Sequence, residues 1–365
     1  MAATFGYLVF LVRVAVAHRP RALERMNHCG PDGQDLHALV TEAFEAMGAG
    51  FRAESGTAEG FRRKEFKTSG RAAWVKINKG PAGIEGETYD MDTEEFVETS
   101  ERQALLSGLR AMFILPENSY YGVLFVERIG RRNLKQLLQN WVIEPITLGL
   151  RESIVRIEGF AEASDWQLLL ADKQVLQVSE LLRAGPGDDA STAQDRTVKV
   201  TITGGALRNL SERLRQMIVE RVQRRNDKAE LVTETARLTT KRQAEADAFT
   251  VEDKEELDAV TARLDDLNSH EERSFADLLA DLNPVDNPTE QGLVHSAYEV
   301  SVGTRRPERV FSVERESVPQ LVYETGRRLS DTELWSYWVS HAETILNNRG
   351  VSLPAGWAGS DPTAT

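Results

Sequence analysis

The feature that most constrains this chain is an apolar run close to its first residue, from Phe5 to Val12 (FGYLVFLV), followed by Arg13. A signal peptide carries positive charge ahead of its apolar segment, and a membrane-spanning helix needs about 20 uninterrupted apolar residues. This run has neither property, so we expect no targeting segment and no membrane contact. Its β-branched and aromatic residues favour a buried strand instead.

Strand-like and helical patterns alternate along the first half of the chain. Tyr121 to Glu127 is a second apolar strand, and helical spacing over 35–47 and again from Leu134 to Val142 predicts helices. Residues 71–78 and 84–89 have the spacing of a hairpin. Further strands are expected at 154–160 and 174–182, with a short helix beginning at Ser164. This order is typical of an α/β or α+β fold with a mixed sheet built from strand-helix-strand units and some parallel pairing.

A polar segment divides the sequence. Residues 184–196 contain Gly, Pro, Ser and Asp with few apolar side chains, which is the composition of a solvated linker. We therefore expect an α/β domain over 1–183 and a second domain over 197–350, containing a helical hairpin, short antiparallel strands and a closing helix that begins at Ser330. The small polar residues of 351–365 predict a disordered tail.

Charge is distributed unevenly. The chain has 44 Lys and Arg against 57 Asp and Glu, a net charge of −13. Residues 205–243 hold ten basic and five acidic residues (net +5), whereas residues 244–285 hold three basic and thirteen acidic residues (net −10). Opposite charge on two amphipathic helical patterns favours an antiparallel hairpin, and 206–285 is the expected surface for a protein partner or a second copy of this chain.

The single cysteine limits both redox and metal chemistry. Cys29 cannot form an intramolecular disulfide, so a cytoplasmic location is the default expectation. His18, His28, Cys29 and His37 fall close together but match no zinc-ligand spacing, so no metal site is expected from them.

Two acidic patterns are weak candidates for catalysis. Asp90 and Asp92 would project from one face of a strand and could share Mg²⁺, or Asp92 could simply cap a helix. Glu65 and Lys67 form half of a restriction-type nuclease motif, in which a carboxylate holds a metal and a lysine orients water. No clear acidic partner precedes that pair, and Mg²⁺ is implied only if the nuclease hypothesis holds.

Two basic groups are candidates for contact with phosphate or nucleic acid. The first, Arg128, Arg131, Arg132 and Lys135, surrounds Gly130 at the end of an apolar strand, where backbone N–H groups can face an anion. The second, Arg221, Arg224, Arg225 and Lys228, lies on one helical face. Neither belongs to a nucleotide-binding glycine motif, and each could be a solvated surface or pair with acidic residues.

These patterns favour a cytoplasmic interaction protein, a component of a multi-protein system that engages nucleic acid or another phosphate-bearing partner through local basic patches. The net charge of −13 opposes independent nonspecific DNA binding. A metal-dependent nuclease or phosphoesterase is the first alternative, and a structural scaffold associating through its helices is the second.

Overall fold

The structure is a computed structural model of the 365-residue chain. It describes residues 4–53, 59–81, 86–90, 95–99, 106–162, 165, 174–184, 197–203, 206–244, 249–269, 293–303, 309–313 and 321–363. These residues form helices, antiparallel sheets and the loops that connect them. They group into unit 1, which combines Met1–Glu158 with Val322–Thr365, and unit 2, Gly159–Leu321. The closing helix therefore belongs with the first unit and not with the expected second domain, while residues 185–196 of the expected linker lie outside the described residues.

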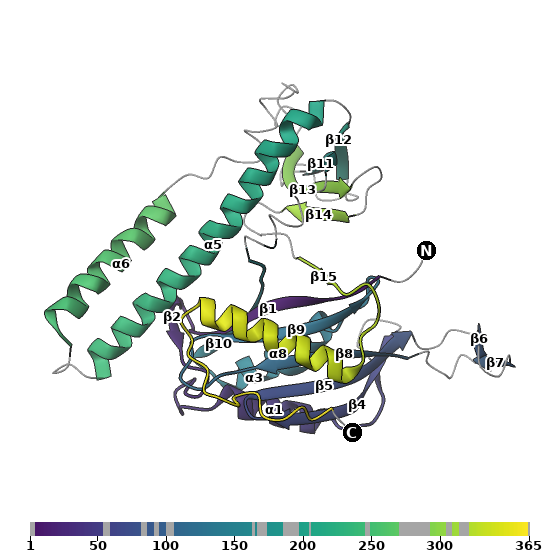
Figure 1. Cartoon of the computed structure of the whole chain (residues 1–365), viewed down its shortest axis with the longest axis horizontal. Coiled ribbons are helices and arrows are strands. Elements are labelled where there is room, and N and C mark those ends of the chain that lie inside the picture. Colours follow the sequence, from purple (N-terminus) through teal and green to yellow (C-terminus); the bar gives the residue numbers. More distant parts are fainter. Residues whose placement is uncertain are drawn as a thin grey trace. The chain divides into compact units, whose positions relative to one another are not determined.

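Within the described residues, unit 1 is built on a nine-stranded sheet in the order β10-β1-β9-β8-β5-β4-β3, with β2 and β15 also paired to β1 (Figure 1). The strands are β1 (Phe5–Val16), β2 (Arg19–Glu24), β3 (Arg52–Ala53), β4 (Glu59–Ser69), β5 (Ala72–Pro81), β8 (Ser107–Ile114), β9 (Gly122–Ile129), β10 (Ser153–Gly159) and β15 (Tyr323–Glu324).

Pairing in this sheet differs from the expected mixed pattern. The ladders that join β1, β9, β8, β5, β4 and β3 in turn are all antiparallel. Strand β5 pairs with β4 and β8, whereas β6 (Gly86–Asp90) pairs with β7 (Glu95–Thr99), so the predicted hairpin of 71–78 with 84–89 is wrong. A local turn signal could not reveal these longer-range partners, and β4 itself was not anticipated.

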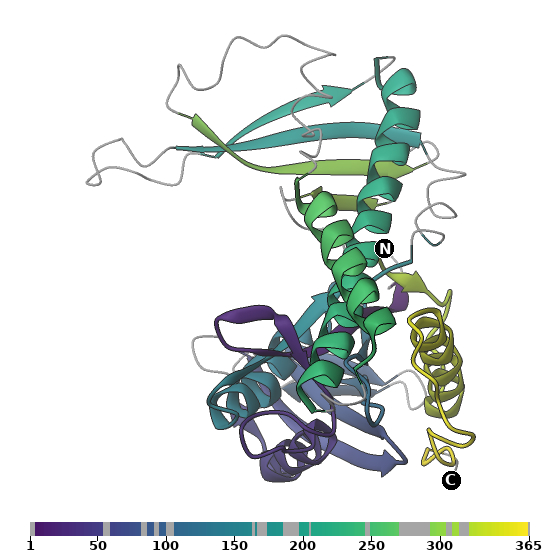
Figure 2. The ribbon, with the colours of Figure 1, turned by 90° about the vertical axis from the view of Figure 1, so that its left-hand side faces the viewer.

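Strand β1 is buried on both faces, which explains its continuous apolar sequence. Phe10 and its alternate neighbours join the core beneath α1 (Leu36–Met47), α2 (Lys135–Leu138), the π-helical segment η1 (Gln139–Ile143) and α3 (Glu144–Gly149). On the opposite face, Tyr7 contacts Trp338 of α8 (Asp331–Asn348), with ring centroids 6.1 Å apart. Figure 2 shows α8 on one side of the sheet and α1 and α3 on the other.

Helix α8 closes the second face through aromatic packing. It begins with the predicted capping box, in which Ser330 and Glu333 exchange side-chain to backbone hydrogen bonds. Trp338 is fully buried, stacked on Phe125 at 5.6 Å and tilted against Trp74 at 5.3 Å. The hydrophobic stripe seen in the sequence therefore packs on the sheet of unit 1.

The segment after α8 also packs on unit 1, in contrast to the expected disordered tail over 351–365. Residues 351–363 are described, and Trp357 is 8% exposed, with its Nε1–H donated to Glu343 at 3.0 Å. Lys67 donates to the carbonyl of Pro362 at 2.8 Å, and the backbone N–H of Arg71 donates to the carbonyl of Trp357 at 3.2 Å. One buried indole thus anchors a segment whose composition is otherwise that of a loop.

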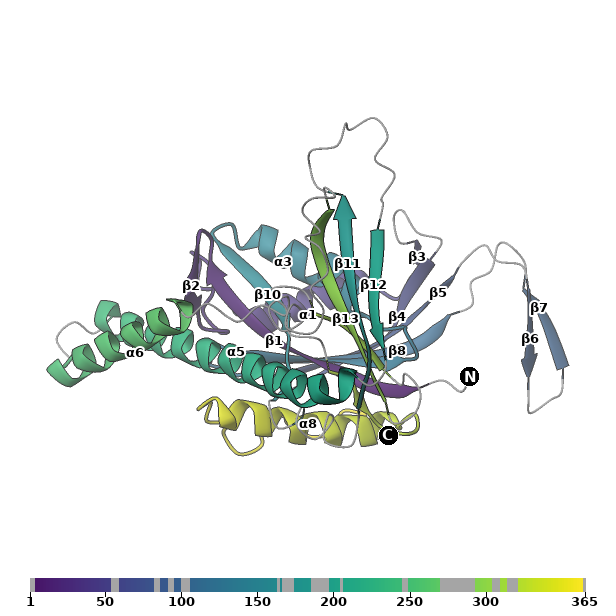
Figure 3. The ribbon, with the colours of Figure 1, turned by 90° about the horizontal axis from the view of Figure 1, so that it is seen from above.

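Unit 2 contains the predicted helical hairpin. Helices α5 (Ala206–Ala244) and α6 (Val251–Ser269) lie side by side (Figure 3), with Lys241 paired to Asp253 at 2.7 Å and Arg237 to Glu256 at 3.6 Å, an antiparallel register. Helix α5 contacts an antiparallel sheet of order β12-β11-β13-β14. Its strands are β11 (Gln174–Ala184), β12 (Thr197–Thr203), β13 (Leu293–Gly303) and β14 (Arg309–Val313).

Two further expectations concern a short helix from Ser164 and membrane-spanning helices. The short helix expected from Ser164 falls almost entirely outside them. Among the helices that are described, none combines the length and the apolar character needed to cross a membrane.

Removal of the Trp338 side chain tests the packing of α8. Trp338→Ala should lower the free energy of unfolding by about 4 kcal/mol, because it leaves a cavity between Phe125 and Trp74. Tyr337→Ala is the matched control, since Tyr337 is 58% exposed and its loss should cost less than about 0.5 kcal/mol. Urea denaturation followed by circular dichroism measures both values, and equal losses would contradict this packing.

The Lys241–Asp253 contact predicts a pH-dependent hairpin. The hydrogen bond from Lys241, with those from Thr250, lowers the pKa of Asp253 from 3.8 to about 2. Because the folded pKa is depressed, the contact stabilises the hairpin at acidic to neutral pH above 3.8, and this stabilisation is lost as the pH falls through about 2.

Asp253→Asn should therefore be less stable than the parent protein in urea denaturation at pH 5 to 7, and the difference should shrink as the pH falls from 3.8 through about 2. Asp258→Asn, which alters an exposed carboxylate of the same helix, should show no such dependence. A deficit that persists unchanged at low pH would assign the effect to something other than ionisation.

Candidate functional site

The site begins with an irregularity in β4. Phe61 and Phe66 both pack into the core beneath α1, although their odd spacing would place them on opposite faces of a regular strand. The ladder with β5 shifts register between Arg63 and Glu65, so Lys64 is an extra residue at a β-bulge. Bulges redirect neighbouring side chains. Here the exposed Lys64 lines a pocket on the face of the sheet that α8 covers.

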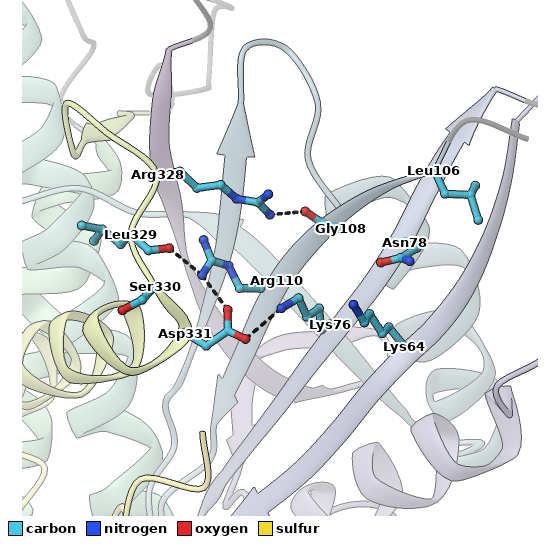
Figure 4. Close-up of a pocket in the computed structure, with 10 residues that line it drawn as sticks. All are labelled: Lys64, Lys76, Asn78, Leu106, Gly108, Arg110, Arg328, Leu329, Ser330 and Asp331. Carbon is cyan, nitrogen blue, oxygen red and sulfur yellow. Dashed lines mark hydrogen bonds and ion pairs between the residues drawn. The ribbon is translucent and has the colours of Figure 1, made fainter. Parts of the chain in front are cut away.

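The pocket has a volume of about 460 Å³ and lies entirely within unit 1. Its walls come from β4, β5, β8 and the residues that lead into α8 (Figure 4). Four cations and one carboxylate line it: Lys64, Lys76, Arg110, Arg328 and Asp331. Segments far apart in the sequence therefore bring positive charge to one concave surface of the size that holds small ligands.

Arg110 is the buried support of this pocket. The side chains of Arg110 and Glu127 are 2% and 4% exposed, and the Arg110 Nε donates to Glu127 at 2.9 Å. Its Nη1 donates to Asp331 at 2.7 Å and to the carbonyl of Leu329 at 2.8 Å. Burial opposes the charge of Arg110, but the hydrogen bonds to Glu127 and Asp331 outweigh it and hold its pKa above the ordinary value. Arg110 is thus a permanent cation with most of its donors already engaged.

The other three cations keep donors for a ligand. Lys76 donates to Asp331 at 2.8 Å, which leaves two of the three ammonium protons. Arg328 donates its Nε to Glu127 at 3.2 Å and its Nη2 to the carbonyl of Gly108, so its Nη1 is available. Lys64 forms no ion pair with the residues that the structure describes. In Figure 4, Lys64 and Lys76 lie side by side on neighbouring strands.

Only part of the predicted basic turn around Gly130 lies near this pocket. Strand β9 lies between β1 and β8 in the sheet, and Arg132 donates to the hydroxyl of Ser107 at 3.2 Å, beside the pocket wall. Gly130 adopts a left-handed φ of 60°, but its N–H donates to the carbonyl of Thr4 at 2.7 Å and is not available to an anion. The Gly130 N–H is therefore not free to make the backbone contact with phosphate that we expected.

The other members of that turn are arranged separately. Arg128 donates to the carbonyl of Gly130 at 2.6 Å, and Arg131 is exposed. Lys135 lies over the ring of Phe10 at 5.4 Å, on the face of the sheet opposite the pocket. These residues do not form one cluster with Lys64 and Lys76.

The second basic group belongs to α5 of unit 2. Arg224 is half-buried and Lys228 is exposed, whereas the side chains of Arg221 and Arg225 lie outside the described residues. The described ion pairs between α6 and α5 use Lys241 and Arg237 instead. This helical face remains a candidate for phosphate contact.

The nuclease candidates receive little geometric support. Asp92 and the side chain of Asp90 lie outside the described residues. Glu65 pairs with Lys67 at 2.6 Å, and Glu59 pairs with Lys79 at 2.9 Å. Over the described part of the chain, no three His, Cys, Asp or Glu side chains are placed to hold a metal ion.

Cys29 is not arranged as a nucleophile. It is fully buried, and its Sγ donates to the carbonyl of Gln34 at 3.0 Å. Burial, with smaller contributions from Glu24 and Asp35, raises its pKa to about 12, so the thiol stays protonated at neutral pH.

No protein-family model, curated protein or solved structure matches this chain. The chemistry of the pocket is therefore the basis for a functional proposal. Its key residues were missed in the sequence, although two signals point to them. One is the odd spacing of Phe61 and Phe66, and the other is the lone charge of Arg110 inside an apolar strand.

The buried ion pair can be tested separately from binding. Glu127→Leu should destabilise the protein by about 3 kcal/mol, because it removes the buried carboxylate that pairs with Arg110 and leaves the partly exposed Asp331 as its remaining anionic partner. The double variant Arg110→Met/Glu127→Leu should recover most of that loss in urea denaturation, since two apolar side chains replace the pair. A double variant as unstable as the single one would show that the pair is not the main contribution at this position.

Proposed function

We propose that this protein is an interaction protein that binds a phosphate-bearing partner through the cationic pocket of unit 1. The observation that carries the proposal is the convergence of Lys64, Lys76 and Arg328 around the buried Arg110. Four cations against the carboxylates of Asp331 and Glu127 leave a local excess of positive charge in a chain whose overall charge is −13. Such a local reversal of sign favours an anionic ligand at this place.

The donors of the pocket suit a phosphate group. Lysine ammonium groups and an arginine fork make charge-assisted hydrogen bonds to phosphate oxygens, and such bonds are about twice as strong as neutral ones. Leu106 and Leu329 are the large apolar residues among the described lining residues, and none of the lining residues is aromatic. Base stacking is therefore not provided for, and contact with a phosphate group is the interaction that the lining supports.

Nucleic acid is one source of such a group, and Arg132 beside the pocket would extend its contacts. Arg224 and Lys228 of unit 2 are a separate candidate for phosphate contact. The overall charge opposes long-range attraction of a polyanion, so binding of nucleic acid would depend on these local patches. The enzyme alternative, a metal-dependent phosphoesterase, would need carboxylates beyond Glu65, which Lys67 already neutralises. The scaffold alternative rests on the α5–α6 hairpin.

Charge reversal at the pocket mouth tests the proposal. Lys64→Glu and Arg328→Glu should each weaken binding about tenfold or more, because close charge pairs couple by over about 1.5 kcal/mol. The probes are a fluorescein-labelled phosphoserine peptide and labelled single-stranded and double-stranded DNA and RNA, measured by anisotropy at two salt concentrations. Arg156→Glu is the matched control, since Arg156 is an exposed cation on β10, at the other edge of the sheet.

Equal loss in Arg156→Glu would indicate a nonspecific charge effect, and no binding of any probe by the parent protein would refute the proposal. Each incubation with nucleic acid is repeated with Mg²⁺ and resolved on a denaturing gel. Cleavage dependent on Mg²⁺ would favour the phosphoesterase alternative.

A further inference from the structure

One position in the pocket wall is a glycine of β8. Gly108 lies between Arg328 on one side and Asn78 on the other (Figure 4). A Cβ atom built on Gly108 would lie 3.2 Å from Asn78 Oδ1, 3.7 Å from Lys76 Cε and 3.9 Å from Arg328 Nη2. The absence of a side chain at Gly108 therefore leaves a space that is bordered by two cations and an amide.

The backbone of Gly108 lies beyond the ladder that joins β8 to β9, because that ladder covers only Ala111–Ile114 of β8. Before Ala111, side chains contact the β8 backbone instead. The N–H of Arg110 donates to the Glu127 carboxylate at 3.1 Å, and the carbonyl of Gly108 accepts from Arg328. Alternate residues of a strand direct their backbone polar groups to the same side, so the Gly108 N–H also points away from β5. Within the described ladder, β9 provides no carbonyl for this N–H.

We propose that the phosphate group binds directly against Gly108, where it fills the space left by the missing side chain and accepts a hydrogen bond from the Gly108 N–H. This inference rests on the proposed function and names the subsite that the phosphate uses in the same pocket. Glycine allows an anion to approach the backbone closely, and both Lys76 and Arg328 keep donors for its oxygens. The subsite recognises the phosphate group and not its substituent, so inorganic phosphate alone should bind there.

A methyl group at Gly108 tests the subsite without a change of charge. Gly108 does not have a left-handed φ, and Asn78 need give only a few tenths of an ångström, so Gly108→Ala should match the parent protein in urea denaturation. Its methyl group occupies the subsite, so its affinity for inorganic phosphate should fall about tenfold or more. Gly149→Ala is the matched control and should bind like the parent protein, because a Cβ at Gly149 of α3 meets nothing within 4 Å.

The backbone hydrogen bond gives a second measurement, made on the parent protein itself. Inorganic phosphate is titrated at pH 7.5 into protein labelled with 15N-glycine, and the amide signals are followed by NMR after triple-resonance assignment. The Gly108 amide proton should move downfield, because a hydrogen bond to a charged acceptor is short and strong. The Gly149 amide proton should stay in place.

The outcomes separate this inference from the proposed function. A parent protein that binds neither inorganic phosphate nor the phosphoserine peptide would refute the proposed function, and this inference with it. If the parent protein binds phosphate and Lys64→Glu weakens that binding, but Gly108→Ala binds as tightly as the parent protein, the phosphate lies elsewhere in the pocket and only this inference is wrong. A Gly108 amide proton that stays in place during binding overturns it as well, whatever the stability of Gly108→Ala. Weaker binding by a stably folded Gly108→Ala, together with the downfield shift, is the result that supports the inference.

Discussion

A sheet whose central strands are apolar on both faces must have each face covered by other elements. Most of the arrangement of unit 1 follows from this requirement. Strands β1 and β9 place Phe10 and Leu124 in the core beneath α1, and place Tyr7 and Phe125 against α8. The first cover comes from helices close to these strands in sequence. The second comes from residues after 321, so the chain returns to the sheet on which it began.

The candidate site is a consequence of this second cover. When Trp338 packs on Phe125, the residues just before α8 are held beside the start of β8. Arg328 then reaches the carbonyl of Gly108, and Asp331 reaches Lys76 and Arg110. The pocket therefore lies where a helix that is required for burial meets charged residues of β4, β5 and β8.

Charge has different roles in the two units. In unit 1, Arg110 is buried with Glu127, where a missing partner would be costly, and this pair fixes the floor of the pocket. In unit 2, the pairs that Lys241 and Arg237 form with α6 are more exposed and select the antiparallel register of the hairpin. The first arrangement creates a place for an anion, whereas the second neutralises opposite charges within the protein.

Local patterns determined much of the secondary structure. The helical spacing of 36–47, the Ser330–Glu333 capping box, the buried strand from Phe5 and the charge-matched hairpin were all predicted from the sequence, because a few neighbouring residues carry each signal. Strand partners were not predicted. The pairing of β5 with β8 and β4, and the membership of α8 in unit 1, depend on contacts between residues far apart in the chain.

The site shows the same division. The sequence displays Lys64, Lys76, Arg110 and Arg328 as scattered cations without a motif, and the basic turn around Gly130 looked more promising. Only the tertiary structure shows that the Gly130 N–H is hydrogen-bonded to the carbonyl of Thr4. Only the tertiary structure shows that a β-bulge directs Lys64 towards the pocket. Side-chain chemistry and local periodicity are properties of neighbouring residues, so the sequence determined them. The tertiary structure decided which distant charges line one pocket. This depends on strand register and on the element that covers the second face of the sheet, and both are set by contacts between residues far apart in the chain.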